Sequence, residues 1–205
     1  MIRKLLALFA FLGTLMLAGP LHAQSAAAPD AFVRQLSDEV LDALKNDKAV
    51  QGGDVARIRT LVDAKVLPHV NFQRMTAAVV GRSWRTATPE QKQRLQEEFK
   101  TLLVRTYAGA LTQVKNQSVA LKPFRGNAAD QEVVVRSEVR GGSEPIQLDY
   151  RLEKAGDAWK IYDVNVAGVW MVDQYKNSFA QEIASGGLDG LISKLAERNK
   201  SGGKG

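Results

Sequence analysis

Apolar side chains recur every three to four residues through the first part of the chain, which is the spacing of amphipathic helices. Asp30 is the expected N-cap of a first helix, and Asp54 of a second helix that ends around Pro68. A short third helix is expected over 72–80, ending at Gly81. The pattern therefore predicts a helical N-terminal part.

The clearest helix start is the run Thr88-Pro89-Glu90-Gln91. Thr88 is a favourable N-cap, Pro89 suits the first helical position, and Gln91 lies where a capping box needs its side chain. Apolar positions continue along one face to about Val114. We expect one long amphipathic helix here.

The period then changes from 3.6 to 2, which predicts strands over 119–121, 132–139, 146–153 and 159–166. The loop at 141–143 makes the second and third of these antiparallel neighbours. After Gly168 the helical spacing returns over 170–184 and 188–199, interrupted at Gly186-Gly187.

This order predicts an α+β fold. N-terminal helices and one long helix are expected to pack on a curved four-stranded antiparallel sheet, with closing C-terminal helices. A sheet with one apolar face, curved against a helix, commonly encloses an apolar pocket between sheet and helices.

The N-terminus has the pattern of a secretory signal peptide. Arg3 and Lys4 precede an uncharged apolar stretch over 5–18, which is short for a membrane span of about 30 Å. Cleavage is expected after about Ala23. A retained anchor is the alternative, because Leu21 is bulky for the position two residues before the cleavage site.

The chain contains no cysteine, so disulfides, a catalytic or metal-binding thiolate and a lipid-bearing cysteine are all excluded. An exported chain without cysteine is typical of the bacterial periplasm. The expected organisation is as follows: signal peptide 1–23, disordered leader 24–29, single α+β domain 30–199, and disordered tail 200–205.

The formal net charge is +6, of which Arg3 and Lys4 supply two. Basic residues are interspersed with acidic ones, so the pattern excludes a nucleic-acid-binding protein and allows only transient contact with anionic membrane surfaces.

Catalytic and metal-binding patterns are scarce, and the chain is predicted not to be an enzyme and to need no cofactor or metal. Once the signal is removed, His69 is the one histidine left, and capping a helix end is its expected role. Phosphate-binding loops and nucleophile motifs are missing. The enzyme alternative is a small periplasmic isomerase or hydratase that uses Asp163, beside Asn165 on one strand face, as a proton-transfer base.

The chain resembles the MlaC family, also called the toluene-tolerance family, over roughly residues 30–199. The matching segments are 67–72, 81–91, 99–107, 159–164, 168–169 and 187–191. The resemblance implies a soluble periplasmic phospholipid carrier that moves lipid between an outer-membrane lipoprotein complex and an inner-membrane ABC transporter. It would maintain outer-membrane lipid asymmetry, with phospholipid as cargo. A structural adaptor with a filled core is a third possibility.

The lipid would lie in an apolar pocket, with its headgroup outside. The lipid-binding residues are expected from their position in the resemblance and from the side of the helix or strand that faces inward. They are Phe99, Leu103, Tyr107, Val135, Ile146, Leu148, Tyr150, Val164, Val166, Val169 and Trp170. Each of them has plain core packing as its alternative. Arg82 and Arg85 are expected to form surface ion pairs, with approach to a headgroup phosphate as the alternative.

Overall fold

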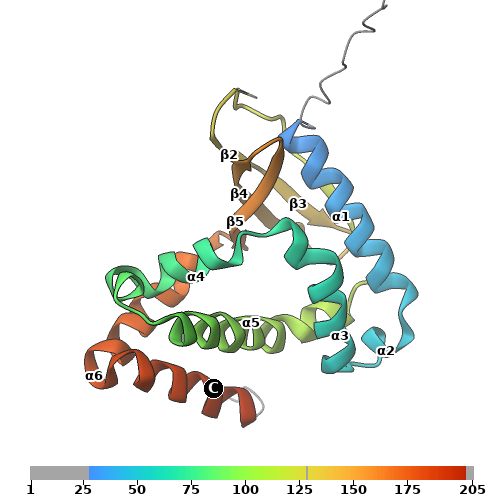
Figure 1. Cartoon of the computed structure of the whole chain (residues 1–205). Coiled ribbons are helices and arrows are strands. Elements are labelled where there is room, and N and C mark those ends of the chain that lie inside the picture. The colour runs from blue at the N-terminus through green and yellow to red at the C-terminus, as the bar shows by residue number, and fades with distance from the viewer. Residues whose placement is uncertain (1–27, 128, 202–205) are drawn as a thin grey trace, which may run out of the picture.

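The computed structural model describes residues 28–127 and 129–201, so the predicted signal peptide lies outside the described residues, as do most of the leader and tail. Figure 1 shows the sheet with α1 along one side and the other helices below it, and the long helix α5 lies apart from the strands. The α+β class predicted from the sequence is confirmed.

The N-terminal part is helical, as predicted. Its elements are α1 (Pro29–Asn46), α2 (Lys48–Gln51), α3 (Val55–Leu61), the π-helix η1 (Val62–Val66), the 3-10 helix η2 (Leu67–His69), α4 (Phe72–Val80) and the 3-10 helix η3 (Gly81–Arg85). Asp54 caps α3 by accepting a hydrogen bond from the Arg57 amide at 3.0 Å. The predicted cap at Asp30 is wrong: Ala28 is the N-cap, and the helix begins at Pro29, which suits a first helical position.

Helix α5 (Pro89–Thr112) begins with the predicted capping box. The Gln91 amide donates to Thr88 Oγ1 at 3.2 Å, and the Thr88 amide donates to Gln91 Oε1 at 3.0 Å. The principal contacts of α5 are with α6 (Met171–Lys200), α3 and α4. The long helix therefore reaches the sheet through other helices.

The sheet has six strands in the described part of the chain. They are β1 (Ser118–Leu121), β2 (Glu132–Val135), β3 (Ser137–Arg140), β4 (Ile146–Ala155), β5 (Ala158–Val166) and β6 (Val169–Trp170). The strands pair antiparallel in the order β1-β3-β4-β5-β6, and β2 also pairs with β4. Four strands were expected; one is divided in two, and Val169–Trp170 adds a short strand.

The division between β2 and β3 has a local cause at Ser137. The Ser137 amide donates to the Asp149 carboxylate at 3.0 Å instead of to a strand carbonyl, and its hydroxyl donates to the Leu148 carbonyl. A second irregularity shifts the register of β4 and β5 between Arg151 and Leu152. Bulges of this kind bend a strand and increase its twist.

Helix α6 bends at Gly187, where φ is 67°. This left-handed conformation favours glycine because it has no Cβ. The predicted interruption at Gly186-Gly187 is confirmed in position. The bend directs the last part of α6 back along α5, where the Asn199 side chain donates to the Glu98 carbonyl at 2.9 Å.

The hydrophobic core consists of three clusters of buried side chains. Cluster 1 joins α4, α5 and α6; cluster 2 joins α1 to β2, β4 and β5; cluster 3 joins α1, α2, α3 and α5. Val70 packs against both cluster 1 and cluster 2, and Val40 against both cluster 2 and cluster 3. The sheet and α5 thus belong to different parts of the core.

Candidate functional site

One face of the sheet is apolar because strand register aligns its aliphatic residues. Tyr150 lies opposite Val135 on β2 and opposite Val164 on β5. Helix α1 covers this face by packing Val33 and Leu36 in cluster 2. Burial raises the pKa of the Tyr150 hydroxyl, against the opposing effect of its hydrogen bonds.

The same face continues beyond α1 as a group of apolar side chains that stay accessible. Leu148 pairs with Val166, which pairs with Val169, and Ile146 lies two residues before Leu148 on β4. Ile146 is 48% exposed and Val169 49%, whereas Leu148 and Val166 are partly buried. We call Ile146, Leu148, Val166 and Val169 the open apolar strip.

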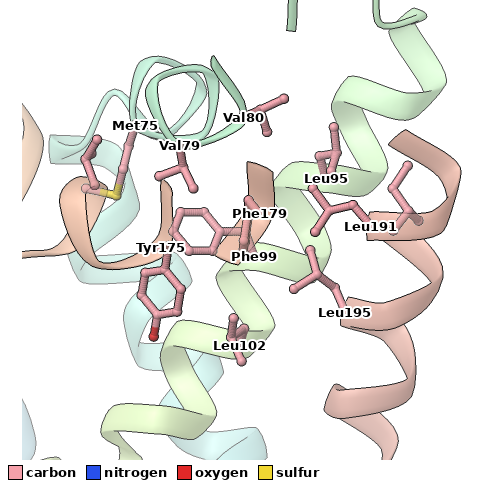
Figure 2. Close-up of a cluster of buried hydrophobic side chains, with 12 residues drawn as sticks. Met75, Val79, Val80, Leu95, Phe99, Leu102, Tyr175, Phe179, Leu191 and Leu195 are labelled. Atoms are coloured by element: carbon pink, nitrogen blue, oxygen red, sulfur yellow. The ribbon is translucent and has the colours of Figure 1, made fainter. Parts of the chain in front are cut away.

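The predicted residues on α5 have different surroundings. Phe99 is fully buried in cluster 1, within 5.2 Å of the Tyr175 ring and 5.4 Å of the Phe179 ring between centroids (Figure 2). Leu103, one turn further on, is partly buried against the same cluster. Tyr107 is also partly buried, and this burial raises the pKa of its hydroxyl, with a smaller contribution from Tyr175.

Trp170 lies on the other face of the sheet. It pairs with Asn165, which pairs with Asp149, so these three side chains point away from the open apolar strip. The Arg151 guanidinium lies 4.0 Å from the centroid of the Trp170 ring. Strand pairing therefore separates Trp170 from Leu148, Val164 and the other predicted residues of β4 and β5.

Asp163, the residue of the enzyme alternative, is fully buried on this second face. Its Oδ1 accepts hydrogen bonds from the amides of Val164 at 2.9 Å and Val172 at 3.1 Å, and its Oδ2 accepts one from Arg151 at 2.8 Å. Burial raises the pKa of Asp163, against the opposing effects of these partners. Both carboxylate oxygens accept hydrogen bonds from other groups of the protein. Asp163 is therefore a structural carboxylate that joins β5, β4 and α6.

An ionic network near Asp163 was not predicted from the sequence. Arg74 on α4 pairs with Glu132 at 2.7 Å and with Glu153, and it lies 3.7 Å from the centroid of the Tyr162 ring. Its members come from distant parts of the chain, so no local sequence pattern predicts it. The Arg74 guanidinium and the Tyr162 hydroxyl lower the pKa of Glu132.

The predicted surface ion pairs of Arg82 and Arg85 are wrong for the described residues: both arginines lie in η3, and neither pairs with an acidic group there. His69 lies in η2, with its ring 5.8 Å from that of Phe32. Among residues 28–127 and 129–201, no three His, Asp or Glu side chains gather as they would to hold a metal ion. No helix there is both long and apolar enough to span a membrane.

Comparisons with known proteins place this geometry in a family. The family model described as MlaC protein matches residues 34–197. The intermembrane phospholipid transport system binding protein MlaC of Haemophilus influenzae is 25% identical over 174 residues, covering 83% of this chain and 81% of that protein. The toluene tolerance protein ttg2D of Pseudomonas putida is 27% identical over 176 residues, covering 85% and 82%.

A solved structure is similar in fold. The phospholipid-binding protein of Ralstonia solanacearum, determined in complex with a phospholipid, has a TM-score of 0.84 and 48% sequence identity, covering 87% of this chain and all of that one. The family match spans most of this chain and agrees with this similarity in fold. The chain belongs to the MlaC protein family.

Proposed function

We propose that this protein is a phospholipid carrier of the bacterial periplasm. It shuttles lipid between an outer-membrane complex and an inner-membrane ABC transporter, and so maintains the lipid asymmetry of the outer membrane. The observation that carries the proposal is the open apolar strip, where four aliphatic side chains continue a buried sheet face into an accessible region.

The energetic requirement of lipid transport fits such a surface. A two-tailed phospholipid has roughly 30 methylenes, and each is stabilised by about 0.8 kcal/mol when it leaves water. A carrier must offer apolar surface for most of these groups, yet must let the lipid leave again. Aliphatic side chains without specific polar partners meet both needs.

The proposed pocket lies between the open apolar strip and the side of α5 that carries Leu103 and Tyr107. In Figure 1, α4 lies between the sheet and α5, whereas α3 lies beside the C-terminal half of α5, where both helices contribute to cluster 3. Phe99, Val135 and Tyr150 are buried in clusters 1 and 2, and they support the pocket from behind. Trp170, on the opposite face, lies outside the proposed pocket.

The relatives support the cargo and the setting. The Ralstonia protein was determined with a phospholipid, and the Haemophilus protein bears the name of an intermembrane phospholipid transport system. The predicted signal peptide at 1–23 supports export to the periplasm. The two membrane complexes are proposed on the resemblance and on the Haemophilus protein's name.

Lipid extraction of the purified mature protein tests the proposal. We expect about one phospholipid per protein, detected by native mass spectrometry and by thin-layer chromatography of the extract. Protein stripped of lipid should take phospholipid from vesicles and deliver it to acceptor vesicles. Protein that carries no lipid and takes none from vesicles would refute the carrier function.

A further inference from the structure

The outer edge of β2 offers backbone hydrogen-bonding groups to solvent. Lys154 donates its amide to the Gln131 carbonyl at 2.9 Å, which sets the phase of the pairing between β2 and β4. In an antiparallel pair, successive residues direct their backbone groups alternately toward and away from the partner strand. Glu132 and Val134 therefore direct their N–H and C=O groups away from β4.

This outward phase agrees with the next bond along the chain. The Arg136 carbonyl, two residues after Val134, accepts a hydrogen bond from the Lys122 amide at 2.8 Å. Beyond Lys122 the chain leaves the sheet, and Figure 1 shows this connection rising beyond β2. No hydrogen bond from the described residues reaches the backbone groups of Glu132 and Val134. Within residues 28–127 and 129–201, the edge therefore has no pairing partner.

A groove of about 470 Å³ runs along this edge. Its lining includes Arg125, Asp130, Glu132, Val134 and Arg136. Val134 is 41% exposed, on the face opposite Val133 and Val135. The groove therefore combines a strand edge with an accessible aliphatic side chain.

Two arginines of the groove are available to an acidic partner. Glu132 pairs with Arg74 at 2.7 Å, although Arg74 also pairs with Glu153, and Asp130 Oδ2 accepts a hydrogen bond from the Asn127 amide at 3.0 Å. The guanidinium groups of Arg125 and Arg136 have no ion pair within the described part of the chain. Two unpaired arginines beside a free strand edge suit an extended segment that carries carboxylates.

We propose that β2 is a docking edge for an extended, acidic segment of a partner protein, which adds to the sheet as a further strand. Main-chain hydrogen bonds to Glu132 and Val134 provide affinity, and Arg125 and Arg136 select carboxylate side chains. The edge is separate from the proposed lipid pocket, since Val134 lies on the opposite face of the sheet from the open apolar strip.

Peptide titration of the mature protein tests the docking edge. The probe is a blocked six-residue peptide of alternating valine and glutamate, compared with the same peptide carrying lysine for glutamate. A third version with N-methylated backbone amides cannot form a strand ladder. We expect that only the unmethylated acidic peptide binds, and that its affinity falls with added salt. Binding should shift the NMR signals of the Glu132 and Val134 amides.

Matched variants identify the contact. Val134→Pro removes the outward N–H without breaking a bond to β4, and Val134→Thr keeps that N–H. Val134→Pro should lower the affinity for the acidic peptide about tenfold, whereas Val134→Thr should bind this peptide nearly as tightly as the parent does. The double variant Arg125→Glu with Arg136→Glu should abolish the preference for glutamate over lysine. All variants should keep their bound phospholipid.

Three results would overturn the docking edge: no binding of the acidic peptide at millimolar concentration, equal binding of the acidic and lysine peptides, or equal affinity of Val134→Pro and Val134→Thr. Phospholipid content is measured in the same variants. If it stays normal while any of these three results is found, the docking edge is rejected and the carrier function is not affected. If the parent protein itself contains no phospholipid, that result counts against the carrier function and not against the docking edge.

Discussion

Arg151 on β4 and Asp163 on β5 form an ion pair across the sheet, with 2.8 Å between Nη1 and Oδ2. Asp163 is fully buried, whereas the Arg151 side chain is partly exposed and lies against the Trp170 ring. The same carboxylate accepts the Val172 amide at the start of α6. One side chain thus joins two strands to the closing helix, on the face opposite the open apolar strip.

Removing this carboxylate should destabilise the protein. Asp163→Ala leaves the Val172 amide and the Arg151 guanidinium without their acceptor, so we expect a loss of about 2–3 kcal/mol in the free energy of unfolding. Asp163→Asn keeps an acceptor oxygen for the amides and should lose less. Urea unfolding followed by circular dichroism measures both variants, and a loss below about 1 kcal/mol for Asp163→Ala would contradict this role.

The enzyme alternative makes a different prediction for the same residue. If Asp163 were a proton-transfer base, Asp163→Asn would abolish activity while leaving lipid loading intact. The structural role predicts that Asp163→Asn keeps both lipid uptake and lipid delivery between vesicles at close to parental rates. A folded Asp163→Asn protein that loads lipid but fails in a turnover assay would favour the enzyme.

The pH dependence of stability follows from the same burial. Burial raises the pKa of Asp163 above its ordinary value of 3.8, so the folded state holds this proton more tightly than the unfolded state. The stability contribution is therefore full below the unfolded pKa, and it is lost as the pH rises through the folded pKa. Relative to Asp163→Asn, the parent should gain stability as the pH falls from 7 toward 4.

In the comparison with Asp163→Asn, the contributions of the other carboxylates to the pH dependence of stability cancel, because both proteins contain them. Glu132 and Glu138 have lowered pKa values because of Arg74 and Arg140, so both weaken the fold on acidification in parent and variant alike. Urea titrations of both proteins across this pH range measure the difference. A difference that shrinks on acidification would show that the pKa of Asp163 is lowered in the folded state.

Two exposed valines on opposite faces of the sheet test the lipid pocket. Val169 belongs to the open apolar strip and is 49% exposed, whereas Val134 is 41% exposed on the other face. Val169→Asp places a charge where an acyl chain is proposed to lie, which should lower phospholipid content severalfold. Val134→Asp should leave it unchanged, and equal effects of the two substitutions would reject the proposed pocket.

Phe99 and Tyr107 separate core packing from lipid contact on α5. Phe99 is fully buried among aromatic rings, so Phe99→Ala should cost about 3–5 kcal/mol of unfolding free energy through the cavity it leaves. Tyr107 is only partly buried, so Tyr107→Leu should change stability little while altering lipid uptake. Measuring unfolding and phospholipid content for both variants checks this; a mild Phe99→Ala would contradict the core role.

Short-range chemistry was predictable from the sequence. The capping box at Thr88 and Gln91, the cap at Asp54 and the bend at Gly187 each depend on residues a few positions apart, so their patterns are visible in the chain. The alternation along β4 and β5 likewise identified the strands and their apolar phase. The resemblance to the MlaC family added the proposed function, which periodicity alone does not contain.

Long-range pairing decided the rest. Trp170 follows Val169 directly and shares its apolar character, yet pairing with Asn165 directs it to the opposite face. Val134 and Val169 are both valines in strands, and only the register of the sheet separates the proposed docking edge from the proposed lipid contact. The sequence determined which segments are helix or strand through local preferences, whereas the tertiary structure decided which face each side chain serves, because face depends on partners far along the chain.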